Sequence, residues 1–300
     1  MENQIRLGID LGGTKTEAMA LSATGETLFR DRVETVPDDY QATLSTVKSL
    51  VEKAERSVGG QCSIGIGTPG AISPNTGLLK NSNSTWLNGK PLQQDVEQIL
   101  QRPVRLANDA NCFALSEAVD GAASDANVVF GVIAGTGTGG GIVVNKKVLV
   151  GPNAIAGEWG HNSVPWPNAE EVPGPQCYCG KRGCIEKFLS GPGMSQDFYE
   201  MTGIQLSAKD IVRLALDDDE NAIIVVHRYE DRMARCLASV INILDPDVIV
   251  LGGGMSNIKS LYTNVPKRWG KYVFSDTVNT RLLPPEYGDA SGVRGAAWLW

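Results

Sequence analysis

One local pattern occurs twice in the sequence and limits the folds that this chain can adopt. The apolar stretch 5–10 leads into a glycine turn and a second apolar stretch at 16–21, and a third strand is expected near 27–33. The stretch 128–134 leads in the same way into GTGTGGG, then IVVN, a tight turn and KVLV. Short apolar runs bounded by glycine turns are typical of buried strands. The repeat therefore predicts two similar lobes, each built on a strand, a glycine turn, a strand and a hairpin.

Helical and strand patterns alternate along the rest of the chain, which is typical of an α/β fold. Further strands are expected at 63–67, 103–107 and 246–254. Helices are expected at 40–58, 91–101, 110–122, 190–201, 207–216 and 219–243. The boundaries that we expect are a small N-terminal α/β lobe at 1–118, a larger C-terminal lobe at 119–288, and a C-terminal helix at 289–300 that packs back on the first lobe.

Composition excludes several classes of protein. The chain has 300 residues, 42% of them hydrophobic, and a net charge of -7, so bulk electrostatic binding to nucleic acid is not expected. The N-terminal residues MENQIRLGIDLGG do not resemble a signal peptide, and no apolar run approaches the ~20 residues of a membrane helix. Both observations favour the cytoplasm, where thiols stay reduced.

Glycine-rich turns follow three of the predicted strands. In DLGGTKT (10–16), Asp10 can hold magnesium directly or through water, and glycine N–H groups and Lys15 can face phosphate. A plain hairpin turn explains this first motif equally well. GTGTGGG and LGGGMSN repeat the pattern, and three such turns favour a nucleotide cleft. The predicted nucleotide-binding residues are Asp10, Gly12, Gly13, Thr14, Lys15, Gly135, Thr136, Gly137, Thr138, Gly252, Gly253 and Gly254.

The motif LANDANC places Asn108 and Asp109 where an apolar strand ends. Asp109 can accept the proton of a substrate hydroxyl as that hydroxyl attacks phosphorus. A helix N-cap is the alternative, since Asp and Asn are both strong caps, and the motif taken alone favours it.

Four potential metal ligands cluster within and before the segment CYCGKRGCIE. They are His161, Cys177, Cys179 and Cys184, a Cys3His set that suits a closed, structural zinc site. A disulfide and a zinc finger that binds nucleic acid are the alternatives. Reduced thiols disfavour the first, and the negative net charge and single ligand set disfavour the second. The remaining cysteines, at 62, 112 and 236, lie in apolar stretches and are expected to be core thiols.

Taken together, the motifs resemble the ROK family of bacterial sugar kinases and sugar-responsive repressors. DLGGTKT, GTPGAIS, NDANC, GTGTGGG, GEWGHN, CYCGKRGCIE and LDPDVIVLGGG follow one another in family order over essentially the whole chain. The resemblance implies an actin-like, hexokinase-type fold, with ATP and sugar in a cleft between two α/β lobes. The spacer between His161 and Cys177 is rich in proline and longer than we expect for the family.

The resemblance also implies roles for individual residues. Asp109 is the expected general base. The expected sugar contacts are Gly70, Asn83, Asn108, Asp109, Glu158, His161 and Glu186. His161 is expected to bind zinc through one ring nitrogen and to face the sugar with the other. Zinc then braces the sugar-binding loop instead of activating water.

The expected reaction is ATP- and Mg²⁺-dependent phosphorylation of a hexose at O6. NSNSTWLNGKPL and SGVRGAAWLW resemble the fructokinase and mannokinase group, which makes fructose the leading substrate. A kinase of N-acetylglucosamine or of another hexose is the alternative within the family. A sugar-responsive regulator without catalysis is the alternative of another class, and the intact Asp109 and phosphate turns argue against it. No DNA-binding segment is expected before Asp10, and the family implies a homodimer.

Overall fold

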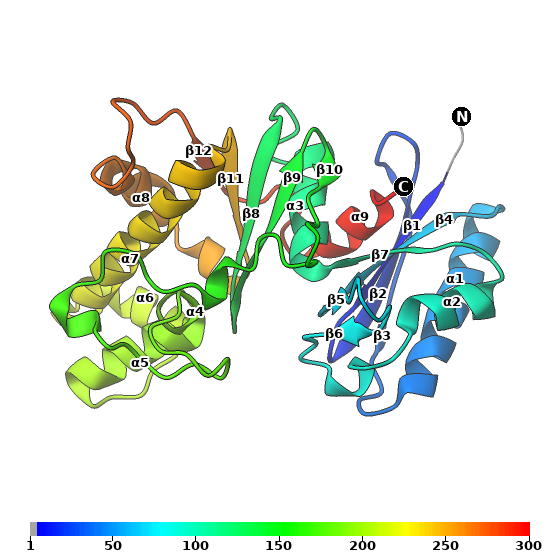
Figure 1. The fold of residues 1–300 in the computed structure, drawn as a ribbon, viewed down its shortest axis with the longest axis horizontal. Helices are drawn as coiled ribbons and strands as arrows, with labels where there is room; N and C mark the ends of the chain where they lie inside the picture. The colour runs from blue at the N-terminus through cyan, green and yellow to red at the C-terminus, as the bar shows by residue number, and fades with distance from the viewer. Residues whose placement is uncertain (1–4) are drawn as a thin grey trace. The chain divides into compact units, whose positions relative to one another are not determined.

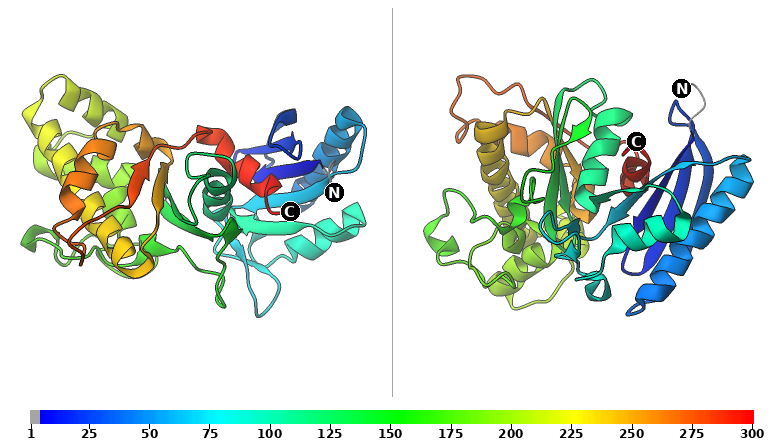
Figure 2. Two further views of the ribbon diagram at one scale, coloured as in Figure 1. Left: turned by 90° about the horizontal axis from the view of Figure 1, so that it is seen from above. Right: turned by 45° about the vertical axis from the view of Figure 1, so that its right-hand side comes forward.

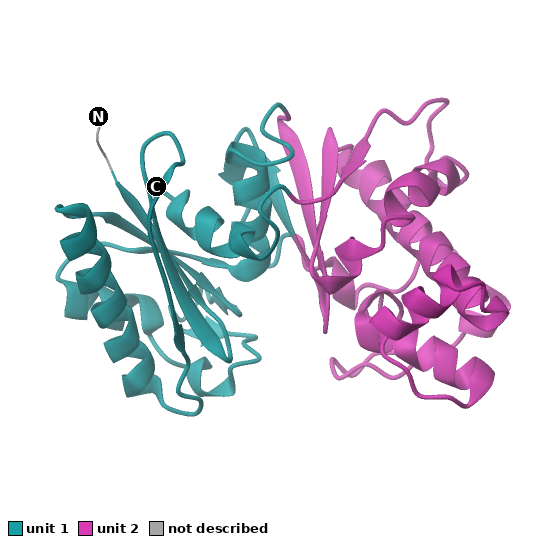
Figure 3. Cartoon of the chain, turned by 180° about the vertical axis from the view of Figure 1, so that it is seen from behind, with its two compact units in different colours: residues 1–125, 141–156, 286–300 teal, residues 126–140, 157–285 magenta. Residues whose placement is uncertain are grey.

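The chain forms two compact units, coloured separately in Figure 3. The computed structural model describes residues 5–300. The prediction that the N-terminal stretch is not a signal peptide therefore falls partly on residues 1–4, which lie outside the described residues. One unit contains the chain up to Asp125, Gly141–Ala156 and Glu286–Trp300, and the other contains Ala126–Gly140 and Gly157–Pro285. This division does not test the lobe boundaries expected from the sequence, which remain predictions.

The first unit is built on a sheet with the strand order β3-β2-β1-β4-β7. Strands β1 (Arg6–Leu11), β2 (Lys15–Leu21) and β3 (Thr27–Glu34) pair antiparallel. Strand β4 (Ser63–Thr68) pairs in parallel with β1, and β7 (Arg105–Asn108) pairs in parallel with β4. Figure 1 shows α1 (Tyr40–Val58) and α2 (Leu92–Leu100) beside this sheet. The unit also holds α3 (Asp109–Val119), α9 (Ser291–Ala297), the short strands β5 (Ala71–Ile72) and β6 (Leu79–Lys80), and the 3-10 turns η1 (Thr85–Leu87) and η5 (Gly288–Ala290).

Alternation along β1 separates the two faces of this sheet. Leu7, Ile9 and Leu11 are at most 3% exposed and belong to one apolar core with the buried faces of α1 and α2. Helix α1 begins where Asp39 caps the Ala42 amide, and it ends at Gly59 in a left-handed conformation (φ 72°). The opposite face of the sheet receives α9, through a core of Met19, Leu21, Val293 and Ala297.

Two glycines permit the close approach of α9 to the sheet. A Cβ atom on Gly8 would lie 2.0 Å from the Val293 carbonyl oxygen, and one on Gly65 would lie 1.8 Å from the Ala296 carbonyl oxygen. Both neighbours are backbone atoms, which cannot move aside as a side chain can. Figure 2 shows α9 against these strands from two further directions.

We expect the substitution Gly8→Ala to lower the free energy of unfolding by about 3 kcal/mol, because an added methyl group overpacks a contact between two backbones. Urea denaturation followed by circular dichroism measures this change. The matched control is Gly60→Ala, since nothing lies within 4 Å of a Cβ atom there. Equal stability of the two variants would contradict this account of the packing.

The second unit holds most of the second sheet, with the strand order β10-β9-β8-β11-β12. The strands are β8 (Val128–Ala134), β9 (Thr138–Val144), β10 (Lys147–Val148), β11 (Val248–Gly252) and β12 (Arg281–Leu283), with β11 parallel to β8 and to β12. This order repeats that of the first sheet, so the duplicated module predicted from the sequence is confirmed. The expected third strand of the second copy is shorter than predicted, because only two of its residues pair.

Helices cover much of the second unit. They are α4 (Glu186–Leu189), α5 (Gly191–Thr202), α6 (Ala208–Leu216), α7 (Glu220–Leu244) and α8 (Leu261–Trp269), with the 3-10 turns η2 (Trp159–His161), η3 (Ala169–Glu171) and η4 (Gly254–Asn257). Helix α7 packs against α4, α5, α6 and α8. Among residues 5–300, no helix is both long and apolar enough to cross a membrane.

Candidate functional site

Two carboxylates influence each other in the first unit. Asp10 lies near the end of β1, and Asp109 begins α3 directly after β7. Strand β4 separates these strands, but its Gly67 has no side chain and a Cβ there would lie 3.4 Å from Asp10 Oδ1. Burial, followed by the charges of Asp109 and Glu17, raises the pKa of Asp10 to about 7. Carboxylates held near one another in this way fit a divalent cation, which would favour their charged forms.

The cap of α3 is Asn108, and Asp109 is the first helical residue. The Asn108 side chain accepts a hydrogen bond from the Asn111 amide at 2.9 Å. Asp109 Oδ1 accepts from the adjacent Ala110 amide at 2.8 Å. The capping alternative therefore explains Asn108, which was predicted as a sugar contact, and the Asp109 carboxylate also accepts an amide of the first turn. The role of Asp109 as the base stays a prediction.

The turn between β1 and β2 is a hairpin with an exposed tip. The Gly12 amide donates to the Lys15 carbonyl at 3.0 Å, while Gly13, Thr14 and Lys15 are exposed. The plain-turn interpretation is thus correct for the backbone, and the exposed tip remains available to a ligand. A Cβ on Gly13 would lie 3.4 Å from Ser84 Oγ, so the loop that carries the exposed Asn83 runs beside this tip.

Gly70 is buried against the same loop. A Cβ at this position would lie 2.5 Å from the Lys80 carbonyl oxygen and 3.0 Å from the Ser82 amide nitrogen. The first unit thus brings Gly70, the loop of Asn83, the tip of the first turn and the two carboxylates into one region. Residues that are predicted to contact sugar and phosphate, to hold Mg²⁺ and to act as the base need to lie near one another in this way.

The second unit contains a cavity of about 1220 Å³ next to the second glycine turn. Its lining includes Gly135, Thr136, Gly191 and Gly254, together with the apolar Met255 and Ile258. Two of the three predicted nucleotide turns therefore meet at this cavity. Gly252 and Gly253 do not line it: Gly252 ends β11, and Gly253 (φ 77°) lies against the Ala134 carbonyl.

Gly137 and Thr138 face the end of the cysteine segment. The Thr138 amide donates to Glu186 Oε2 at 3.1 Å, and a Cβ on Gly137 would lie 2.9 Å from the same oxygen. The buried Thr138 Oγ1 has no hydrogen-bond partner in the described part of the chain, so a polar ligand atom can satisfy it. Glu186, predicted as a sugar contact, is therefore also bonded to the predicted phosphate turn.

The turn that carries Glu158 and His161 is held against the same strand. A Cβ on Gly160 would lie 1.9 Å from the Thr138 carbonyl oxygen, and Trp159 Nε1 donates to the Gly139 carbonyl at 2.8 Å. The Trp159 ring packs edge-on against Phe130, with ring centroids 5.4 Å apart. These contacts leave Glu158 exposed and His161 half-buried.

The four predicted metal ligands form one cluster. The ligand atoms of His161, Cys177, Cys179 and Cys184 all lie within 4.8 Å of one another. Cys179 Sγ is 3.5 Å from Cys184 Sγ, and Cys177 Sγ is 3.7 Å from His161 Nδ1. A tetrahedral zinc ion with bonds of about 2.3 Å to sulfur spaces its ligands about 3.8 Å apart, so the group fits. All six cysteines are free thiols, and the disulfide alternative is wrong.

Tyr178 is a contact that the sequence analysis missed. Its hydroxyl lies 3.0 Å from His161 Nε2, and the two rings meet edge-to-face. His161 therefore directs Nδ1 toward the cysteines, while Nε2, the nitrogen expected to face the sugar, contacts a tyrosine that is 82% exposed. The spacing of this tyrosine between two cysteines was the only sequence signal for the contact.

Comparison with known proteins agrees with this organisation. A model of the ROK family matches residues 6–300. An N-acetyl-D-glucosamine kinase of Yersinia pseudotuberculosis serotype O:1b (strain IP 31758) is 39% identical over 299 residues, which cover 97% of each chain. The chain belongs to the ROK family.

Solved ROK structures extend the comparison to the fold. A ROK hexokinase from Thermus thermophilus superposes with a TM-score of 0.88 at 28% identity, over 99% of this chain and 97% of that one. A ROK family glucokinase from Streptomyces griseus, in complex with glucose and AMPPNP, gives a TM-score of 0.77 at 26% identity over 98% of both chains. The expected actin-like, hexokinase-type α/β fold is confirmed.

Proposed function

We propose that this ROK protein is a sugar kinase that transfers the γ-phosphoryl group of ATP to O6 of a hexose. The observation that carries the proposal is the pair of carboxylates, Asp10 and Asp109, beside the exposed hairpin tip of the first unit. Phosphoryl transfer needs a charge-compensating cation and an oriented nucleophile, and it needs little other chemistry from the protein.

Each residue then has a defined task in the reaction. Asp109 takes the proton of the 6-hydroxyl while that oxygen bonds to the γ-phosphorus, and the bond to the bridging oxygen of ADP breaks. Asp10 is the proposed ligand of Mg²⁺, directly or through water. Mg²⁺ supplies neutralisation of the charge on the phosphates.

The nucleotide is assigned to the glycine turns. The backbone N–H groups of Thr136 and Gly137 and the hydroxyl of Thr138 are proposed to contact phosphate, and the cavity lined by Gly135 and Gly254 is proposed to hold the adenosine. The hairpin tip with Gly12, Gly13, Thr14 and Lys15 is a second proposed phosphate contact. The proposed hexose contacts are Gly70, Asn83, Asn108, Glu158, His161 and Glu186.

Zinc is assigned a bracing role. The Cys3His cluster fits the ion, and all four of its protein ligands are accounted for, so the ion has no position left for a reacting water. The ion would hold one end of the sugar-binding loop at His161 and the other end near Glu186.

N-acetyl-D-glucosamine is the hexose that the comparisons support best. The curated relative reported above carries this activity at 39% identity over nearly its whole length. Fructose, the leading substrate in the sequence analysis, is the second candidate. The stretches 81–92 and 291–300, which resemble the fructokinase and mannokinase group, favour it.

We expect the purified protein to release ADP from ATP and Mg²⁺ only when a hexose is present. The panel is N-acetylglucosamine, N-acetylmannosamine, fructose, mannose and glucose, with a blank that lacks sugar. The highest kcat/KM with N-acetylglucosamine supports the leading substrate, and the highest value with fructose or mannose supports the second candidate. If no sugar gives turnover while one still raises the melting temperature, the proposed kinase is wrong and a sugar-responsive regulator replaces it.

A further inference from the structure

The segment between His161 and Cys177 has almost no apolar anchor of its own. Of residues 162–176, only Val164 and Glu171 are buried, and Trp166 and Val172 are 48% and 60% exposed. Apolar contact in this segment is therefore limited, and its largest contribution is the Trp166 ring, which stacks on Tyr272 with ring centroids 5.3 Å apart. A segment whose regular structure is limited to the short turn η3 needs another source of order, because each residue held in one conformation loses about 1–2 kcal/mol of backbone entropy.

Polar contacts supply that order at Glu171. Its Oε1 accepts hydrogen bonds from Arg232 Nε at 2.7 Å and from Arg235 Nη2 at 2.9 Å. Its Oε2 accepts from the Asn168 amide at 2.9 Å and closes a capping box at η3. Burial by itself would raise the pKa of Glu171, but the hydrogen bonds from the two arginines outweigh it and lower the pKa to about 2.

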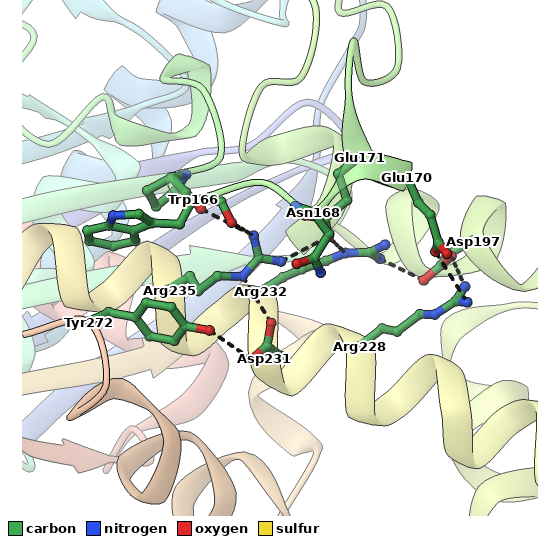
Figure 4. Close-up of polar contacts among 11 residues, drawn as sticks. Trp166, Asn168, Glu170, Glu171, Asp197, Arg228, Asp231, Arg232, Arg235 and Tyr272 are labelled. Carbon is green, nitrogen blue, oxygen red and sulfur yellow. Dashed lines mark hydrogen bonds and ion pairs between the residues drawn. The ribbon is translucent and has the colours of Figure 1, made fainter.

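Arg235 extends the contact along the segment. Its Nη1 donates to the carbonyl oxygens of Pro165 at 3.2 Å and of Trp166 at 2.8 Å, while Nε donates to Asp231 at 3.0 Å. The side chain is 1% exposed. Figure 4 shows this guanidinium between α7 and the chain at Trp166 and Glu171. One α7 side chain thus holds the segment at two points.

Arg232 connects the same segment to the helices that follow the cysteines. Its Nη1 donates to Asp197 of α5 at 2.6 Å, and its guanidinium lies 5.1 Å from the ring centroid of Phe188 in α4. Phe188 is two residues after Glu186. Tyr229, one turn earlier on α7, donates to the Leu189 carbonyl at 2.7 Å. Helix α7 therefore contacts the chain on both sides of the cysteine cluster.

We propose that Glu171, Arg232 and Arg235, called the arginine clamp below, position the zinc- and hexose-binding segment as a second anchor, whose contacts include no metal ligand. The inference rests on the proposed function and deepens it, since the clamp acts through His161 and Glu186 and does not itself touch substrate. Its residues are positioning residues. With the clamp in place, the cysteines and His161 reach the geometry of a metal site with less entropy to lose.

The clamp also follows from the cost of burying its charges. Two arginines and one glutamate at most 10% exposed need charged partners, and removal of Glu171 would leave Arg232 paired only with Asp197 and Arg235 only with Asp231. Such a set contributes little net stability compared with apolar packing, but its directional hydrogen bonds favour the arrangement of the chain in which all of them are made. A binding loop of this length needs such contacts to hold its residues in one arrangement.

The first test is the rate at which the zinc-loaded protein loses its metal. We expect Glu171→Gln to transfer zinc to the chelator 4-(2-pyridylazo)resorcinol about 10-fold faster than the unchanged protein. This is the lower end of the roughly 10–100-fold effect typical of direct hydrogen-bond partners of metal ligands, because the clamp acts on the ligands only through the chain that carries them. In steady-state kinetics, the KM for the hexose is expected to rise about 10-fold, while the KM for ATP stays within about 2-fold. Arg235→Lys, which keeps the charge but loses the forked contact to Pro165 and Trp166, is the milder second variant.

Glu230→Gln is the matched control. Glu230 is also on α7 and 1% exposed, and it pairs with Asn264 and Arg268 of α8, away from the clamped segment. It is expected to lose stability without faster zinc release or a higher hexose KM. The proposal is overturned if Glu171→Gln and Glu230→Gln both fold and release zinc at equal rates. If Glu171→Gln does not fold, an unchanged rate of zinc release from Arg235→Lys overturns it. Zinc release needs no sugar, so absence of kinase turnover with a clear difference in release would contradict the proposed function alone.

Discussion

The substitution Asp109→Asn is expected to reduce kcat by about 1,000-fold, the typical contribution of a positioned general base. The amide has nearly the shape of the carboxylate and can keep the bond from the Ala110 amide, but it cannot accept the proton of the attacking hydroxyl. The exchange also removes one of the charges that raise the pKa of Asp10, although burial, the largest cause, remains. The charged form of Asp10 is therefore favoured in the variant, and metal binding is not expected to fail through protonation of Asp10. ADP release measures kcat.

Two further measurements separate lost chemistry from lost structure in this variant. The shift of the melting temperature on addition of the hexose is expected to persist, because the remaining proposed sugar contacts are unchanged. Asp210→Asn is the control, since Asp210 likewise lies in the first turn of a helix, α6, where it is half-buried. Near-normal turnover in Asp109→Asn would refute the assignment of the base.

Much of the fold was predictable because its signals are local. Helix α1 was predicted at 40–58, where Asp39 caps one end and Gly59 ends the other, and the structure has the same bounds. The strand and glycine-turn repeat likewise predicted both sheets. In each case the residues that decide the element lie within it or next to it.

The contacts that organise the site were less predictable, because they join residues far apart in the sequence. No residue near Glu171 in the sequence indicates that its partners lie on α7, about 60 residues later. The sequence pattern around Arg232 and Arg235 predicts only an ordinary polar helix face. The contact of Glu186 with the Thr138 amide is of the same kind. The metal cluster was the exception, since the chemistry of three cysteines and one histidine limits the alternatives without any knowledge of distance.

The substitution Cys177→Ser is expected to remove zinc and to lower kcat/KM for the hexose by about 100-fold. A serine hydroxyl is a poor zinc ligand, and Cys177 is the buried cysteine whose sulfur lies 3.7 Å from His161 Nδ1. Without the ion, burial raises the pKa of Cys184 to about 12, so its thiol stays neutral. A neutral thiol cannot hold the His161 end of the loop and the cysteines together as the bond to zinc does. Metal analysis is expected to find about one zinc per chain in the unchanged protein and none in the variant.

The location of the damage distinguishes a brace from a general requirement for buried cysteine. Cys236→Ser makes the same exchange at a thiol that is fully buried on α7 outside the cluster. It is expected to lose stability but to retain zinc and a normal hexose KM. If the unchanged protein contains no zinc and Cys177→Ser is harmless to folding and turnover, the brace is refuted. If both cysteine variants lose activity equally with zinc still bound, the effect belongs to core packing. Loss confined to Cys177→Ser, with the KM for ATP preserved, is the result that the geometry of His161 and Glu186 leads us to expect.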